Sequence, residues 1–128
     1  MRRLALALLL AAFSGSAAAE WVAVHDTDEY IAYADLATML REGNMVRMRD
    51  LIDLKFPRPS PYGNRHSSST ASSEFDCQNM RIRTLDFALH SGQMGNGHIV
   101  ETVSESNQWL PVMPGTLLRI LWQRACGK

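Results

Sequence analysis

The clearest alternation of hydrophobic and polar positions in the chain runs from Met45 to Phe56. An alternation of period two is typical of a strand with one buried face and one face in water. Two residues interrupt it, because Asp50 falls on the hydrophobic side and Leu51 on the polar side. We therefore expect a β-bulge or an edge position there. The hydrophobic side consists of Val46, Met48, Ile52, Leu54 and Phe56, and the polar side of Arg47, Arg49, Asp53 and Lys55.

Shorter hydrophobic segments predict four more strands, at residues 21–24, 30–34, 80–89 and 98–103. Glycines separate the last two segments, as is typical of a hairpin turn. The inward-facing residues change phase near Thr84, which predicts a second bulge. The segment from Asp35 to Arg41 is compatible with one or two helical turns or with a continued strand.

Three prolines and a glycine between residues 57 and 63 predict an irregular loop after the long strand. The next segment, residues 66–73, is almost entirely Ser, Thr and Ala. A flexible linker and a hydroxyl-rich strand both fit that composition. We favour a strand, because the segment runs directly into Glu74–Cys77.

One helix is predicted near the C-terminus, over residues 116–125, with Thr116 as a suitable N-cap. Large apolar side chains fill so many of its positions that the helix must pack against the sheet. The order of elements predicts a single domain over residues 20–128. Its class is α+β, mainly β: an antiparallel sheet of about six strands with one C-terminal helix on a face of the sheet.

Residues 1–19 have the layout of a secretory signal peptide. Arg2 and Arg3 precede a run of Leu, Ala and Phe, and Ala17-Ala18-Ala19 fits a cleavage site. The run is too short to span a bilayer as a mature anchor, and no later segment approaches that length. We expect cleavage after Ala19 and export to the periplasm or the cell surface. No cysteine follows the run, so we expect no lipid anchor.

The sequence contains two cysteines, Cys77 and Cys126. In an exported protein, such a pair favours a disulfide bond, and two free thiols or an intermolecular bridge are the alternatives. An intramolecular bond would close a loop of about fifty residues, which contributes roughly 4 kcal/mol in the chain-entropy model. It would also tether the end of the predicted helix to a central strand.

Charge and candidate chemistry narrow the function. The 13 basic and 13 acidic residues leave no basic excess for binding nucleic acid. The four histidines, at positions 25, 66, 90 and 98, lack the carboxylate or thiolate partners of a metal site, so we expect neither a metal nor another cofactor. No nucleophile and base can be assembled into a catalytic set, so we expect no enzyme activity.

Basic side chains recur at every second position of the strands predicted at 45–56 and 80–89. If these strands are neighbours, the basic residues form a patch suited to an anionic ligand or an acidic partner surface. A solvated sheet face is the alternative. The proline-rich loop adds an aromatic residue suited to an exposed contact. The candidate ligand or partner surface comprises Arg47, Arg49, Lys55, Tyr62, Arg81 and Arg83.

Short motifs follow one another along the whole mature chain: Trp21-Val22, Gly43-Asn44, Ser73–Cys77, Gly95-Asn96-Gly97, Trp109 with Pro111-Val112, Pro114-Gly115-Thr116 and Cys126. In this order they resemble the surface-adhesin protein E family of bacterial envelope proteins. The resemblance implies an antiparallel sheet with a C-terminal helix tethered by a disulfide bond. It also implies binding to host matrix or serum proteins.

We therefore expect the mature chain to be a non-enzymatic, protein-binding or adhesion-like module of a bacterial envelope. Its expected partner is a host matrix or serum protein, or another envelope protein. The alternative is a periplasmic accessory or inhibitor protein with no adhesive role. An antiparallel sheet with exposed edges can also pair edge to edge into a homodimer.

Overall fold

The computed structural model describes residues 20–103 and 107–128, and the signal peptide predicted at residues 1–19 lies outside the described residues. Strands dominate the described chain, and an α-helix is its last element. In order, the elements are β1 (Trp21–Asp26), β2 (Tyr30–Glu42), β3 (Met45–Pro59), β4 (Arg65–Asp76), β5 (Arg81–His90), the 3₁₀ helix η1 (Gln93–Gly95), β6 (Ile99–Val103), β7 (Leu110–Pro111) and α1 (Leu117–Cys126).

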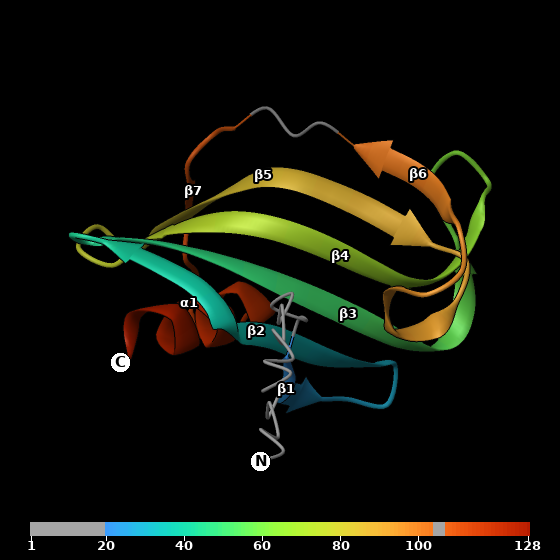
Figure 1. Ribbon diagram of the computed structural model, residues 1–128, viewed down its shortest axis with the longest axis horizontal. Coiled ribbons are helices and arrows are strands. Elements are labelled where there is room, and N and C mark those ends of the chain that lie inside the picture. The colour runs from blue at the N-terminus through green and yellow to red at the C-terminus, as the bar shows by residue number, and fades with distance from the viewer. Residues whose placement is uncertain (1–19, 104–106) are drawn as a thin grey trace, which may run out of the picture.

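The strands form one antiparallel sheet in the order β1-β2-β3-β4-β5-β6, which is their order along the chain. The short β7 pairs with the start of β5. The sheet arches, and α1 lies on its inner side at one end of the arch (Figure 1). We call the side that faces α1 the inner face and the opposite side the outer face. This architecture confirms the predicted fold class.

Two strands run further than the sequence indicated. The segment from residue 35 to 41, left open between helix and strand, continues β2. Pro57 and Pro59, assigned to a loop, belong to β3. The first residue of β2, Tyr30, pairs with Leu54, so β3 has an open edge beyond that point. Proline is tolerated there because its missing N–H leaves no ladder hydrogen bond unmade.

The prediction of a β-bulge or an edge position at Asp50 and Leu51 is wrong. Asp50 pairs with Ala71 and Leu51 with Thr70 in regular register, and β3 is a central strand. Asp50 is 8% exposed and Leu51 is fully buried. Both can be buried because the outer face is also covered here: a Cβ on Gly95 of η1 would lie 3.4 Å from the Leu51 side chain. The alternation of hydrophobic and polar residues along β3 is therefore interrupted where the outer face also becomes buried.

The other predicted bulge and the glycine-rich turn are confirmed. β5 contains one extra residue, Leu85, beside Thr84, at the point where its register with β4 shifts. The turn between β5 and β6 folds into η1. The backbone N–H of Met94 donates to Asp53 Oδ1 at 2.8 Å, which fixes η1 against β3.

The longest irregularity lies in β2 after Asp35. Residues 36–39 stand opposite a single residue of β3, since the register resumes only at position 40. The backbone N–H and hydroxyl of Thr38 donate to the Asp35 carboxylate, at 3.3 and 2.6 Å. This local loop carries Leu36 and Met39 against the core, which explains why the sequence here reads partly as helical.

The main core lies between the inner face and α1. Thr116 caps the helix, since its hydroxyl accepts from the Arg119 N–H at 3.3 Å, as predicted. Neither helix of the described chain is long and apolar enough to cross a membrane. The buried residues of this core are Ala34, Val46, Met48, Phe75, Cys77, Ile82, Val112, Leu121, Trp122, Ala125 and Cys126.

Two contacts fasten α1 to the end of β4, and a third fastens that end to the β2–β3 turn. Cys77 and Cys126 form the predicted disulfide bond, so the free-thiol and intermolecular alternatives do not hold. The Trp122 indole, 3% exposed, donates from Nε1 to the Asp76 carbonyl at 2.9 Å. The Cys77 N–H donates to the Asn44 carbonyl at 2.9 Å, which ties the same point to the β2–β3 turn.

Replacement of Cys77 by Ser is expected to lower the free energy of unfolding by about 4 kcal/mol. The bond spans 49 residues, and its loss releases that loop in the unfolded chain. Urea denaturation of the mature protein, followed by tryptophan fluorescence, measures the change. The variant Cys77→Ser/Cys126→Ser separates the loss of the bond from the effect of one unpaired thiol. An unchanged unfolding midpoint in both variants would contradict the prediction.

Candidate functional site

Four of the predicted surface residues lie together at one end of the outer face, and two lie elsewhere. Arg47 and Arg49 on β3 point to the same side as Arg81 and Arg83 on β5. A continuous basic patch would require these two strands to be neighbours. They are not, because β4 lies between them. The outward-facing residues of β4 therefore determine whether the charges of the four arginines are compensated.

Lys55 and Tyr62 lie towards the opposite end of the sheet. Lys55 stands eight residues beyond Arg47 on β3, roughly 26 Å along the strand. Its Nζ forms an ion pair with Asp26 Oδ1 at 2.8 Å. Tyr62, in the β3–β4 turn, is 80% exposed. These two residues belong to a separate region, which we call the β3–β4 tip.

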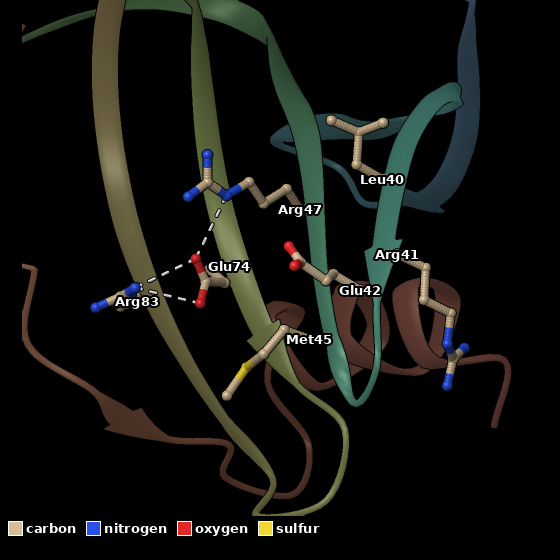
Figure 2. Close-up of a pocket in the computed structure, with 7 residues that line it drawn as sticks. All are labelled: Leu40, Arg41, Glu42, Met45, Arg47, Glu74 and Arg83. Carbon is tan, nitrogen blue, oxygen red and sulfur yellow. Dashed lines mark hydrogen bonds and ion pairs between the residues drawn. The ribbon is translucent and has the colours of Figure 1, made fainter.

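Glu74 of β4 supplies the charge that joins the outer arginines. Arg47, Glu74 and Arg83 stand in one row across three strands. Glu74 accepts from Arg83 Nη2 at 3.2 and 3.3 Å and lies 3.4 Å from Arg47 Nε (Figure 2). Its side chain is only 10% exposed. The row is therefore an Arg–Glu–Arg ion network rather than an uncompensated basic patch.

Glu74 is absent from the predicted surface, although the sequence carries a signal for it. It precedes Phe75, whose burial in the inner core places its own neighbours on the outer face. That Glu74 faces two arginines depends on the strand order, which the hydrophobic pattern does not specify.

Aromatic rings hold the other arginines in place. The guanidinium groups of Arg81 and Arg83 lie 4.4 and 4.7 Å from the centre of the Trp109 ring. Arg49 lies 5.5 Å from the centre of the Trp21 ring. Contacts of this kind contribute about 0.5–1 kcal/mol at exposed sites. These three side chains are consequently fixed by the protein itself.

A cavity of about 580 Å³ opens beside this network. We call it the outer pocket, and Figure 2 shows it. Arg47 is 64% exposed, and its terminal nitrogens point away from Glu74 (Figure 2). Leu40, at the rim, is 68% exposed. The pocket is lined by Leu40, Arg41, Glu42, Met45, Arg47, Glu74 and Arg83.

This arrangement suits recognition rather than acid–base chemistry. The exposed end of Arg47 can donate two parallel hydrogen bonds to a carboxylate. Leu40 and Met45 offer an apolar contact at the same pocket. Among the residues that the structure describes, no group of three His, Cys, Asp or Glu side chains could hold a metal ion.

Asp76 carries the most strongly bound carboxylate beside the network. It is 1% exposed, and its oxygens accept from Arg81 Nε at 2.8 Å and from the Asn79 side chain at 3.0 Å. The backbone N–H groups of Gln78 and Asn79 also donate to it. Burial alone would raise the pKa of Asp76, but these hydrogen bonds outweigh it and lower the pKa to about 2. Asp76 is thus a hydrogen-bonded residue at the end of β4 that holds the following turn.

His90 is buried and belongs to a different contact. Its Nε2 lies 2.8 Å from the Thr70 hydroxyl. Burial, aided by the positive charge of Arg49, lowers the pKa of His90. A neutral imidazole is therefore favoured, as expected for a side chain that packs between two strands.

Replacement of Asp76 by Asn is expected to cost about 2 kcal/mol of stability at pH 7. The native pKa lies below the unfolded value, so this contribution is complete above pH 4 and disappears as the pH falls towards 2. Thermal unfolding at several pH values measures it: the wild type should lose stability between pH 4 and 2, and the variant less so. Asp86→Asn, at an exposed position of the outer face, is the control. Equal acid sensitivity of the wild type and Asp76→Asn would contradict the assignment.

Comparisons with known proteins agree with this fold. Solved structures with a similar fold include three of protein E from Haemophilus influenzae. One has a TM-score of 0.61 at 16% identity, over 81% of this chain and 88% of that chain. Its crystal form II has a TM-score of 0.62 at 17% identity, over 85% and 97%. The selenomethionine form has a TM-score of 0.61 at 15% identity, over 87% and 93%.

At these identities the likeness concerns the fold alone. A search of curated proteins finds no significant match. The family description "Surface-adhesin protein E" matches residues 21–127, which is nearly all of the chain after the predicted signal peptide. The chain therefore belongs to the surface-adhesin protein E family.

Proposed function

We propose that this chain is an exported, adhesion-like module of a bacterial cell surface that binds a protein partner without catalysis. The family match over residues 21–127 carries the proposal. The sequence supports export, through the predicted signal peptide at residues 1–19. The partner is a host matrix or serum protein, and an envelope protein is the alternative.

The outer pocket supports this role because its side chains suit a protein surface. Arg47 offers a partly free guanidinium, and Arg side chains are enriched where interfaces carry most of their binding energy. The carboxylates of Glu42 and Glu74 line the same pocket and disfavour a polyanion. We infer a partner segment with one carboxylate beside an aliphatic side chain, which would meet Arg47 and Leu40.

The β3–β4 tip supports a second contact region. Phe56 is 72% and Tyr62 80% exposed, and aromatic residues commonly anchor interfaces. Ion pairs of Lys55 with Asp26 and of Arg58 with Glu29, at 2.8 and 2.7 Å, hold the base of this hairpin to the β1–β2 turn. A preorganised tip loses less entropy on binding than a loose loop.

Cell-surface location is the first point to test. An epitope-tagged copy on intact cells should be digested by added protease, because an adhesion-like module must reach outside partners. The same cells with a permeabilised outer membrane give the value for complete access. Protection until permeabilisation would favour the alternative, a periplasmic accessory or inhibitor protein with no adhesive role.

Replacement of Arg47 by Ala is expected to weaken partner binding about tenfold, since the pocket loses its exposed guanidinium. Fold stability should change by less than about 1 kcal/mol, because Glu74 keeps its contacts with Arg83. The measurement is retention of the purified mature protein on surfaces coated with extracellular-matrix protein or serum.

Arg124→Ala, at an exposed position of α1 away from the outer pocket and the β3–β4 tip, is the matched control. Leu40→Ser should weaken retention as Arg47→Ala does. Retention of both pocket variants at the wild-type level would rule out the outer pocket as the contact surface.

A further inference from the structure

The inner face carries a buried carboxylate with no hydrogen bond from the described residues. Asp50 points to the same side as Met48, next to the core under α1, and is 8% exposed. Other buried aspartates behave differently: Asp35 accepts from Thr38, and Asp76 accepts from three residues. A buried carboxylate without a partner costs several kcal/mol when it is ionised. Asp50 therefore requires a hydrogen-bonding or charged partner that the described residues do not supply.

Glu101 on β6, which is only partly buried, meets this condition at one of its two oxygens, on the same face. Asp50 pairs with Ala71, Ala71 with Phe87 and Phe87 with Val103, so all four side chains point to the inner face. Glu101 lies two residues before Val103 and points the same way. Its Oε2 is buried, and no described residue donates a hydrogen bond to it.

Apolar side chains occupy the space between the two carboxylates. Ala71 and Leu89 are 9% and 5% exposed, whereas Ile52, Phe87 and Val103 keep part of their surface accessible. This area lies away from α1, because β6 runs at the opposite end of the arch from the helix (Figure 1). Three strand spacings separate β3 from β6, roughly 14 Å across the sheet. One ammonium group cannot contact carboxylates that far apart.

We propose that this area of the inner face, the inner site, binds a partner-protein segment that carries two basic side chains on either side of apolar ones. One basic side chain pairs with Asp50 and the other with Glu101. The apolar residues between them pack on Phe87, Leu89 and Val103. Charge complementarity selects this occupant, because an anionic or purely apolar segment would leave both carboxylates unpaired.

The inner site is independent of the outer pocket. The two lie on opposite faces of the sheet, and their charges have opposite sign, since Arg47 is the exposed group outside and two carboxylates are the unpaired groups inside. The inference thus goes beyond the proposed function, and either one can fail without the other.

The probe is a fluorescein-labelled peptide with the central sequence Lys-Val-Leu-Val-Lys. In an extended strand its two lysines lie roughly 14 Å apart, which matches the separation of β3 and β6. Fluorescence anisotropy with the mature protein measures its dissociation constant. The same peptide with Glu in place of both Lys residues is the ligand control.

Asp50→Asn and Glu101→Gln should each weaken binding of the basic peptide about tenfold. The acidic peptide should bind the wild type no more tightly than the basic peptide binds these variants. Asp86→Asn, on the outer face of β5, is the protein control and should bind as the wild type does. Equal binding of the two peptides, wild-type affinity of Asp50→Asn and Glu101→Gln, or no binding at about 1 mM peptide would each overturn the proposal.

A stability measurement shows that Asp50→Asn is folded. Burial, opposed only in part by Arg49, raises the pKa of Asp50 to about 7. A raised native pKa means that stability falls as the pH rises from about 4 to 7. Asp50→Asn should therefore match the wild type near pH 4 and unfold at a higher urea concentration at pH 8. Lost peptide binding together with this gain in stability assigns the effect to the missing carboxylate.

Discussion

The attachment of α1 to the end of β4 is the constraint on which the rest of the structure depends. Asp76 and Cys77 are consecutive, and both contact the helix: the Asp76 carbonyl accepts from Trp122, and Cys77 is bonded to Cys126. The Asp76 side chain meanwhile binds the turn that follows and Arg81 of β5. One short segment thereby fixes the helix, the β4–β5 turn and Arg81 on the outer face.

This attachment also determines which parts of the sheet are covered. The ten residues of α1 cover only one end of the inner face, while η1 covers part of the outer face near Leu51. β3 is therefore buried on its inner side at Val46 and Met48, under the helix, and also on its outer side at Leu51, under η1. Asp50 and Leu51 lie where both sides are covered, which explains why a carboxylate and a leucine at adjacent positions are both buried.

Strands, the helix, its cap and the disulfide bond were predictable, because each depends on local pattern or on a single pair of residues. The supposed bulge at Asp50 failed for the opposite reason: an alternation of period two assumes one buried face, and η1 is placed by contacts distant in sequence. The outer arginines were found by the same alternation. Their ion network was not predicted, since Glu74 joins Arg47 and Arg83 only because β4 lies between β3 and β5. Strand order is a tertiary property that no local period encodes.

The two faces also differ in how salt should act on them. Arg47 is 64% exposed, so attraction to a partner carboxylate is screened over about 8 Å at physiological ionic strength. Asp50 is 8% exposed and stands in apolar surroundings, where screening by ions is weak. The outer pocket is thus suited to rapid, salt-sensitive encounter, and the inner site to contacts that form only after water has been excluded. A sheet arched over one helix provides both environments, because it leaves each face open at a different end.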